Sequence, residues 1–171
     1  MPRRPRPAPL WLALAAALAC DGGLEPEPIC GVTFVGVCGT IQFIGAAPAE
    51  TDAVYVVAYQ TFPQTCDDLY GFRPFPPPSL PPPYAGAVPY SVSLSPGRYE
   101  WVLAVWKKQG SLTLTVADTA LLREAGHYRD PATPSQPGSV TVSDGGTGGI
   151  DLTVDFANLH PVSDYFACTE P

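Results

Sequence analysis

The chain has 171 residues and a net charge of −7, with only 15% charged residues and 22 prolines. Because phosphate contacts need Lys and Arg, nine basic residues against sixteen acidic ones argue against a nucleic-acid-binding protein. So much proline argues against a helical bundle, the β-branched and aromatic content argues against disorder, and the length fits one domain of ordinary size.

The N-terminal segment, residues 1–19, has the composition of a secretory signal. Arg3, Arg4 and Arg6 form a positively charged start, and residues 10–19 (LWLALAAALA) form an apolar run. This run is too short to span a membrane, which takes about 20 residues, but it suits the apolar part of a signal peptide. We therefore expect residues 1–19 to be removed rather than to fold.

Small residues followed by a cysteine end the apolar run, as ALAC at residues 17–20. This order resembles the lipobox of bacterial lipoproteins. The resemblance implies that cleavage leaves Cys20 as the new N-terminus, with lipid on its sulfur and its amine. The alternative interpretation is an ordinary signal peptide with a cysteine nearby. Residues 21–28 (DGGLEPEP) suit a flexible tether, so we expect residues 20–37 to connect the lipid to a folded domain.

Removal of residues 1–19 makes the chain more acidic. It takes away three of the nine basic residues and none of the sixteen acidic ones, so the net charge falls from −7 to −10. Such a charge repels anionic surfaces. We therefore expect the protein to contact the membrane through lipid on Cys20 and not through a basic patch.

Cysteine usage indicates an exported protein with disulfides. Assigning Cys20 to lipid leaves an even number of cysteines, and exported proteins meet oxidising conditions. Of the pairings that remain, we favour Cys30–Cys38, which closes a small loop, and Cys66–Cys168, which fastens the C-terminal tail to a long loop. A zinc site is the alternative, but no two of these cysteines have C-x-x-C spacing.

Alternating or continuous apolar patterns predict six short strands and a candidate seventh. In residues 150–156 (IDLTVDF), apolar and polar residues alternate, which predicts one buried and one exposed face. Residues 53–60 (AVYVVAYQ) and most of residues 98–106 (RYEWVLAVW) are apolar on both faces, as central strands are. The predicted strands are residues 39–45, 53–60, 88–95, 98–106, 139–143 and 150–156, with 112–116 as the seventh.

Turn-forming segments and one candidate helix lie between the strands. Residues 95–97 (SPG) fit a tight turn between two strands, and residues 144–149 (DGGTGG) fit a flexible hairpin connection. A helix of one or two turns is predicted at residues 117–125, with Asp118 capping its start and Gly126 in the left-handed position after its end.

Six or seven short strands with frequent turns predict a single all-β sandwich over residues 38–160, followed by a tail at residues 161–171. A proline-rich insert, residues 62–89, interrupts this domain with nine prolines that favour extended chain. It is either a displayed binding arm or a stiff crossover that packs its aromatic residues on the sandwich and hides an edge strand. We favour the crossover. The aromatic residues of the insert are Tyr70, Phe72, Phe75 and Tyr84.

Three segments in order carry a resemblance to a known fold. They are residues 39–43 (GTIQF), the apolar strand at residues 52–59, and residues 94–99 (LSPGRY). Together they resemble the carboxypeptidase regulatory-like, or transthyretin-like, β-sandwich domains over residues 38–156. The resemblance implies an Ig-like sandwich in an exported or surface protein, which acts as an accessory or interaction module without catalytic residues.

Residues that carry catalysis or bind metals are sparse. His127 and His160, the two histidines, have no His-x-x-x-His or His-Glu spacing, and no G-x-S-x-G, P-loop or dinucleotide motif occurs. We therefore predict no catalytic residue, no metal and no cofactor. A calcium site and a glycosidase-type carboxylate pair are alternatives, but a solvated acidic surface explains these residues better. The calcium candidates are Asp118, Asp130, Asp144, Asp151 and Asp155, and the carboxylate candidates are Asp67, Asp68, Glu100 and Glu124.

Three aromatic residues are candidates for ligand binding. Trp101 shares a face of its predicted strand with Leu103, which indicates a core position, whereas Trp106 lies on the opposite face. An exposed Trp106 beside Tyr84 or Tyr128 would stack on a sugar ring or anchor a partner. The alternative, which we favour, is that Trp106 covers the second face of the sandwich under residues 117–128.

These features predict a lipoprotein of the bacterial cell envelope, anchored through Cys20 in the periplasm or at the outer surface. We expect it to act without catalysis as an interaction or structural module, with an envelope protein or a glycan as its partner. A carbohydrate-binding module is the first alternative, and an envelope hydrolase is the second.

Overall fold

Short strands follow one another along the chain in the computed structural model, which describes residues 30, 31 and 33–166. The strands are β1 (Gly36–Ile44), β2 (Thr51–Tyr59), β3 (Gly86–Ser93), β4 (Gly97–Tyr99), β5 (Trp101–Lys108), β6 (Leu122–His127), β7 (Arg129–Asp130), β8 (Thr133–Pro137), β9 (Val140–Val142), β10 (Leu152–Asp155) and β11 (His160–Pro161). The helical segments of the described chain are 3-10 turns, namely η1 (Cys66–Tyr70), η2 (Val116–Ala120) and η3 (Val162–Asp164).

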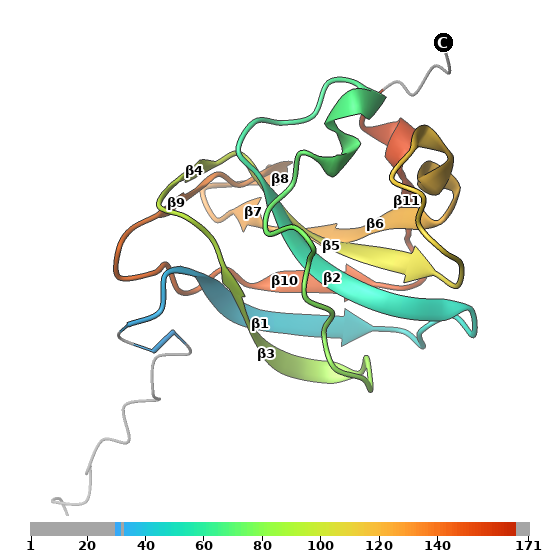
Figure 1. Ribbon diagram of the computed structural model, residues 1–171. Coiled ribbons are helices and arrows are strands. Elements are labelled where there is room, and N and C mark those ends of the chain that lie inside the picture. The colour runs from blue at the N-terminus through green and yellow to red at the C-terminus, as the bar shows by residue number, and fades with distance from the viewer. Residues whose placement is uncertain (1–29, 32, 167–171) are drawn as a thin grey trace, which may run out of the picture.

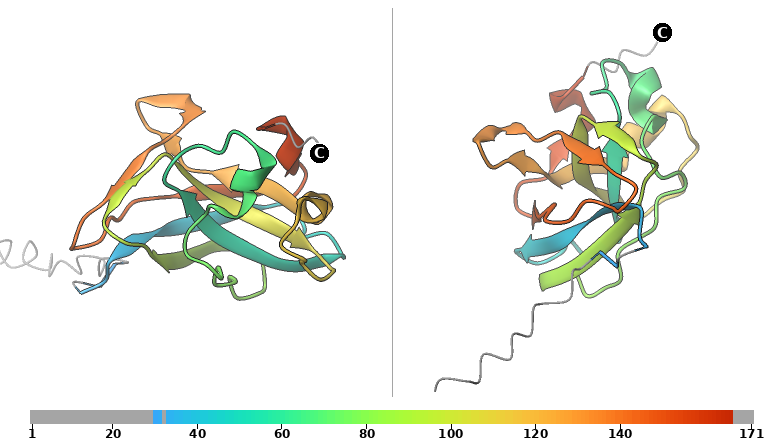
Figure 2. Two further views of the ribbon diagram at one scale, coloured as in Figure 1. Left: turned by 45° about the horizontal axis from the view of Figure 1, so that its top comes forward. Right: turned by 90° about the vertical axis from the view of Figure 1, so that its left-hand side faces the viewer.

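Two sheets form the layers of the sandwich (Figure 1). One has the order β10-β1-β3, with β10 parallel and β3 antiparallel to β1. The other has the order β11-β6-β5-β2 and is antiparallel throughout. The remaining strands form two small two-stranded sheets, β4–β9 and β7–β8. The β7–β8 hairpin projects from the body of the sandwich (Figure 2). The prediction of an all-β sandwich is confirmed.

The core lies between the two sheets and follows the predicted alternation. Ile41 and Phe43 of β1 are buried while Gln42 between them is exposed, and Leu152 and Val154 of β10 are buried in the same way. Burial of these apolar side chains is the main stabilising contribution to such a fold. The buried core residues include Val37, Ile41, Phe43, Val54, Val56, Tyr90, Val92, Val102, Ala104, Trp106, Leu152 and Val154.

Strands β2 and β5 are buried on both faces, as their apolar patterns predict. The prediction that both are central strands holds for β5 alone, because β2 lies at the edge of its sheet. The face assignment for β5 was wrong, however: Trp106 points into the core between the sheets, whereas Trp101 and Leu103 lie on the outer face in a second cluster. A strand that is apolar on both sides carries no signal for which side meets the other sheet. The outer face is covered by the proline-rich segment and by η3, whose Val162 packs in a third cluster.

The proline-rich segment crosses the outer face as a cover and does not extend as an arm. Ala58 and Arg73 exchange two backbone hydrogen bonds of 2.8 Å each, and the Leu80 N–H donates to the Val54 carbonyl at 2.8 Å. These bonds satisfy backbone groups on the edge of β2, which pairs through its other edge with β5. The crossover interpretation is therefore confirmed.

Two predicted elements near residue 120 were wrong. Residues 112–115 form a loop instead of a strand and Val116 begins η2. The predicted helix at 117–125 is the rest of this short turn followed by strand β6. Asp118 does accept hydrogen bonds at the start of η2, but Thr115 is its N-cap residue. Pairing with β5 and β11 overrides the local helical preference of residues 122–125.

Gly126 lies inside β6 and does not end a helix. A Cβ atom there would lie 1.8 Å from the carbonyl oxygen of Thr153 in β10. Only glycine allows the two strands to come this close. The residue therefore serves the packing of one sheet on the other.

Three boundaries also differ from expectation. The predicted tether at residues 20–37 ends inside the fold, because β1 begins at Gly36 and Val37 is fully buried. Residues 144–149 do not join the strands of a hairpin, because β9 pairs with β4 while β10 pairs with β1. The predicted tail at residues 161–171 begins inside the fold, since β11 includes Pro161 and both Val162 and Phe166 are buried.

The predicted Cys30–Cys38 disulfide is present. Cys66 is buried and disulfide-bonded, but its predicted partner, Cys168, lies outside the described residues, as does Cys20. Within residues 30, 31 and 33–166, no helix has the length and apolar character needed to cross a membrane.

Replacing Gly126 with Ala should destabilise the protein by about 3 kcal/mol, because the added Cβ would overlap the Thr153 carbonyl. The measurement is the free energy of unfolding in urea. Gly145→Ala is the matched control, since a Cβ at that position meets nothing within 4 Å. Equal losses in the two variants would contradict the close approach of β6 to β10.

Candidate functional site

A cleft of about 550 Å³ opens along the side of the sandwich where β10 of one sheet faces β6 of the other. Backbone and side-chain polar groups line most of it, unlike the apolar core beneath. Ligands commonly bind in concave sites of this size that hold a few convergent polar groups. The charged and titratable residues of the lining are Glu124, His127, Arg129, Asp151, Asp155, His160 and Tyr165.

A β-bulge in β6 brings Glu124 and His127 to the same face. Ala104 pairs with Gly126 whereas the next residue of β5, Val105, pairs with Glu124, so Ala125 is an extra residue in β6. In a regular strand, residues three apart point to opposite faces. The bulge removes this alternation locally, which is a common way for a strand to aim side chains into a site.

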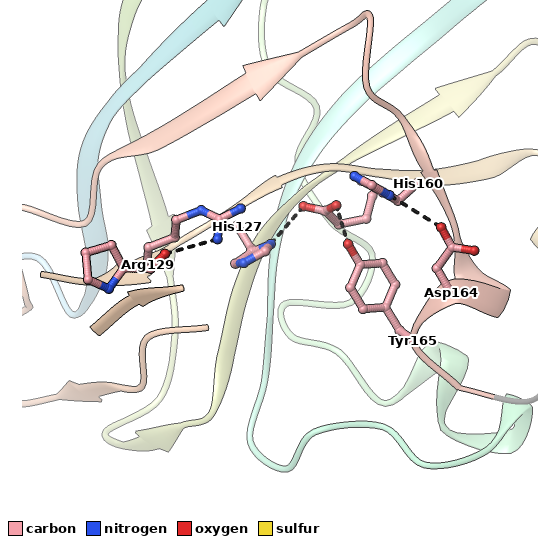
Figure 3. A network of polar contacts seen from close by, with 7 residues as sticks. His127, Arg129, His160, Asp164 and Tyr165 are labelled. Carbon is pink, nitrogen blue, oxygen red and sulfur yellow. Dashed lines mark hydrogen bonds and ion pairs between the residues drawn. The ribbon is translucent and has the colours of Figure 1, made fainter. Parts of the chain in front are cut away.

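Glu124 joins His127 and Tyr165, whose side chains Figure 3 shows directed toward one another, in a polar network. Its Oε1 lies 3.1 Å from Nδ1 of His127, and its Oε2 accepts a 2.6 Å hydrogen bond from the Tyr165 hydroxyl. Glu124 is only 5% exposed. A buried carboxylate is stable only when its oxygens are paired, and here both are.

The environment holds Glu124 in its charged form. Burial by itself raises the pKa of Glu124, but the hydrogen bonds from His127 and Tyr165 and the nearby imidazoles of His127 and His160 together bring the pKa below its usual value. Burial and the hydrogen bond to Glu124 raise the pKa of Tyr165, so its hydroxyl remains protonated and donates. At neutral pH, Tyr165 is therefore the donor and Glu124 the acceptor of the hydrogen bond between them.

Tyr165 and His160 reach the site from the C-terminal segment. β11 pairs with β6 so that His160 lies opposite Glu124, and η3 then turns the chain to place Tyr165 beside the same carboxylate. The centroid of the Tyr165 ring lies 5.0 Å from that of the buried Trp101 ring, and this packing holds Tyr165 in position. His160 is itself 3.4 Å from the Asp164 carboxylate.

The opposite wall of the cleft is acidic. Asp151 and Asp155 lie on the outward side of the β10 segment, as the alternation predicted. One oxygen of each is already used, by the Thr40 N–H at 2.8 Å and the Ala157 N–H at 3.0 Å, which fixes the two carboxylates in place. Among the described residues that line the cleft, Arg129 is the only lysine or arginine, so the cleft favours partners that donate hydrogen bonds or carry positive charge.

The structure does not assemble the aromatic site that the sequence suggested. Trp106 is 4% exposed in the inter-sheet core, where its indole N–H donates to Thr51 Oγ1 at 2.8 Å. An exposed Trp106 platform is therefore wrong. Tyr84 and Tyr128 are partly buried against the same core, and neither lines the cleft.

The acidic residues proposed for a carboxylate pair do not come together in one site. Asp68 accepts hydrogen bonds from Gln64 and Thr65 in its own loop, and Glu100 accepts one from the Phe62 N–H. Only Glu124 of the proposed carboxylate set takes part in the cleft. No three metal-ligating side chains are grouped within the described part of the chain.

Sequence reasoning considered Glu124, His127 and His160 separately and did not bring them together. Tyr165, 41 residues from Glu124, was missed. The spacing Glu124–His127 is the one available signal, and it becomes meaningful only once the bulge at Ala125 is known.

Replacing Tyr165 with Phe should cost about 2 kcal/mol of stability at neutral pH, because it removes a hydrogen bond to a buried charge. The pKa of Glu124 should rise at the same time. Its folded-state pKa lies below the ordinary value of 4.5, so this stabilisation is present above about pH 4.5 and is lost as the pH falls through the folded-state pKa. The difference between wild type and variant should therefore shrink in acid.

The measurements are unfolding free energies from pH 7 to pH 3 and carboxyl titration by NMR. Tyr84→Phe is the control, since the Tyr84 hydroxyl donates weakly to the Leu80 carbonyl, at 3.4 Å, and contacts no carboxylate. A pKa of Glu124 that is the same in wild type and Tyr165→Phe would contradict the assigned network.

Comparison with known proteins yields no relative. No family model matches the chain. No curated protein matches it, and no solved structure does. The resemblance to carboxypeptidase regulatory-like domains therefore stays a prediction.

Proposed function

We propose that this chain is a lipoprotein of the bacterial cell envelope whose β-sandwich acts without catalysis, as a module that binds an envelope partner at the cleft between β6 and β10. The observation that carries the proposal is the buried Glu124 carboxylate, each oxygen of which accepts a hydrogen bond, from His127 and from Tyr165. A carboxylate held in this way is poorly placed to attack a substrate or take its proton. It suits a residue that fixes the shape and charge of a binding surface.

The charge of the cleft indicates the chemistry of the partner. Glu124, Asp151 and Asp155 together outweigh Arg129, and the whole chain is acidic. A segment of an envelope protein that presents Lys or Arg side chains would complement this surface. Such complementarity contributes to specificity and to the rate of association.

The position of the tether is compatible with this role. Cys30 lies beside Gly148, at the end of the sandwich where β1 begins, whereas β11 and η3 lie near the end where β1 finishes (Figure 1). A lipid on Cys20 would be connected through residues 20–29, a segment of at most about 35 Å. Anchoring through this end leaves the Tyr165 end of the cleft directed away from the membrane.

A glycan is the second candidate partner. Asp155, Asn158 and Thr153 offer both acceptors and donors to sugar hydroxyl groups along one wall of the cleft. Because Trp106 is buried, it cannot serve as the aromatic platform on which a sugar ring would stack. Fluorescence titration with a panel of polysaccharides tests the glycan hypothesis. The absence of any response would reject it and leave an envelope protein as the proposed partner.

Changing Cys20 to Ser should move the protein from the membrane fraction to the soluble fraction, because it removes the sulfur that would carry lipid. The measurement is fractionation of cells followed by detection of a C-terminal tag. Asp155→Asn is the control and should stay with the membrane, since it changes the cleft alone. A Cys20→Ser protein that still partitions with membranes would contradict the anchor.

Changing Asp155 to Asn should lower recovery of a bound partner about fivefold, because it removes a charge worth about 1 kcal/mol at a binding surface. The measurement is affinity capture of the tagged, lipidated protein from gently solubilised envelopes. Asp144→Asn removes the same charge from an exposed turn that does not line the cleft. If the two variants capture a partner equally, the cleft is not the interface.

A further inference from the structure

The outer face of the four-stranded sheet contains two adjoining cavities that lie apart from the open cleft. They lie under the cover formed by the proline-rich segment, residues 112–116 and η3. One has a volume of about 40 Å³ and is lined by Trp101, Leu69 and Tyr165, among others. The other has a volume of about 210 Å³ and is lined by aromatic and aliphatic side chains that include Phe75 and Leu114. Both share the walls Phe72, Val105 and Leu122.

Trp101, whose side chain lines the smaller cavity, carries an unused hydrogen-bond donor. Trp101 is 2% exposed, and its Nε1 has no hydrogen-bond partner within the described chain. Buried indole N–H groups normally find an acceptor, and Trp106 shows the normal case with Thr51 Oγ1 at 2.8 Å. An unpaired N–H on a residue that lines a cavity is therefore a candidate donor to a molecule bound there.

The larger cavity opens at a strained and exposed apolar rim. Leu114 has φ of 60°, a conformation that favours glycine, and its side chain is 57% exposed. Phe75 is 49% exposed on the same lining. The Asp118 carboxylate holds this loop, since it accepts hydrogen bonds from the N–H groups of Thr113 and Leu114. A strained backbone that presents an apolar side chain to solvent suggests a binding role at that position.

We propose that the two cavities together bind a small, mainly hydrocarbon ligand that carries one uncharged hydrogen-bond acceptor, and that this acceptor takes the hydrogen bond from Trp101 Nε1. A cavity of about 150 Å³ accommodates a benzene ring, so the 210 Å³ cavity has room for the hydrocarbon body. The 40 Å³ cavity has room for the oxygen-bearing end.

The surroundings favour an uncharged ligand. An ionised group is costly in an apolar cavity unless it is paired. The two charged side chains of the described lining are already engaged: each oxygen of Glu124 accepts a hydrogen bond, and Nη1 of Arg123 donates to the carbonyls of Thr119 and Leu122. The site therefore differs in its chemistry from the polar cleft on the other side of Glu124 and Tyr165. It does not depend on the partner proposed for that cleft.

The test is a titration of the full-length ¹⁵N-labelled protein with 4-phenylbutan-2-one, with butylbenzene as the matched probe that lacks an acceptor. The indole N–H resonances of Trp11, Trp101 and Trp106 are assigned by single Trp→Phe substitutions. The ketone should move the Trp101 indole proton downfield in a saturable manner, while Trp106, which already donates to Thr51, should stay in place. Butylbenzene should bind about tenfold more weakly without that downfield shift.

Two variants separate the roles of the donor and the rim. Trp101→Phe should reduce the affinity for the ketone to that for butylbenzene, as measured by saturation transfer to the ligand. Leu114→Gly relieves the positive φ, so it should keep the fold, yet it should weaken both probes about threefold by removing apolar contact at the rim. The Trp106 resonance reports whether each variant is folded, and if Trp101→Phe is not, Leu114→Gly carries the test.

Several results would overturn the proposal. They are the absence of a saturable shift at Trp101, equal affinity for the ketone and butylbenzene, and unchanged binding of both probes by Leu114→Gly. A Trp101 indole proton that lies upfield in the ligand-free protein and does not respond to the ketone would assign its partner to the ring of Tyr165 or Phe62. A long-lived water that keeps its contact with Trp101 at saturating ketone would assign the acceptor to that water.

Discussion

Where β6 crosses β10, the backbones come so close that a Cβ on Gly126 would lie 1.8 Å from the carbonyl oxygen of Thr153. This approach brings the two sheets together beside the cleft, and the bulge at Ala125 lies next to it in β6. Because the bulge adds one residue to β6, Glu124 and His127 face the same way into the cleft. The geometry of the candidate site therefore depends first on the close approach of the β6 and β10 backbones, and only then on its side chains.

Burial of the Glu124 charge is the second condition for the site. Removing a carboxylate from water is costly, and the cost is offset here by two donors: His127 of the same strand and Tyr165, which lies 41 residues away in the sequence. The wall that Glu124 and Tyr165 form has a polar cleft on one side and apolar cavities on the other. One ion-containing network thus separates two spaces that suit ligands of opposite polarity.

Much of the fold could be predicted because its signals are local. Alternation along residues 39–45 and 150–156 identifies the buried faces of β1 and β10, and the apolar pattern of residues 53–60 identifies β2 as a strand covered on both sides. The cover could be anticipated as well, since proline lacks the N–H that a sheet needs and therefore favours a crossover with few backbone bonds. Which face of β5 meets the other sheet could not be predicted, because both faces are equally apolar.

The site could not be predicted, because its geometry arises from pairings between distant segments. Residues 122–125 (LREA) favour a helix by themselves, and β6 exists because β5 and β11 pair with it. By itself the sequence determined the strands with clear alternation, their buried faces and the close Cys30–Cys38 pair, since these follow from short-range periodicity and spacing. Only the tertiary structure decided the bulge, the register that sets His160 opposite Glu124 and the position of Tyr165, because each depends on hydrogen bonds between strands that local sequence does not encode.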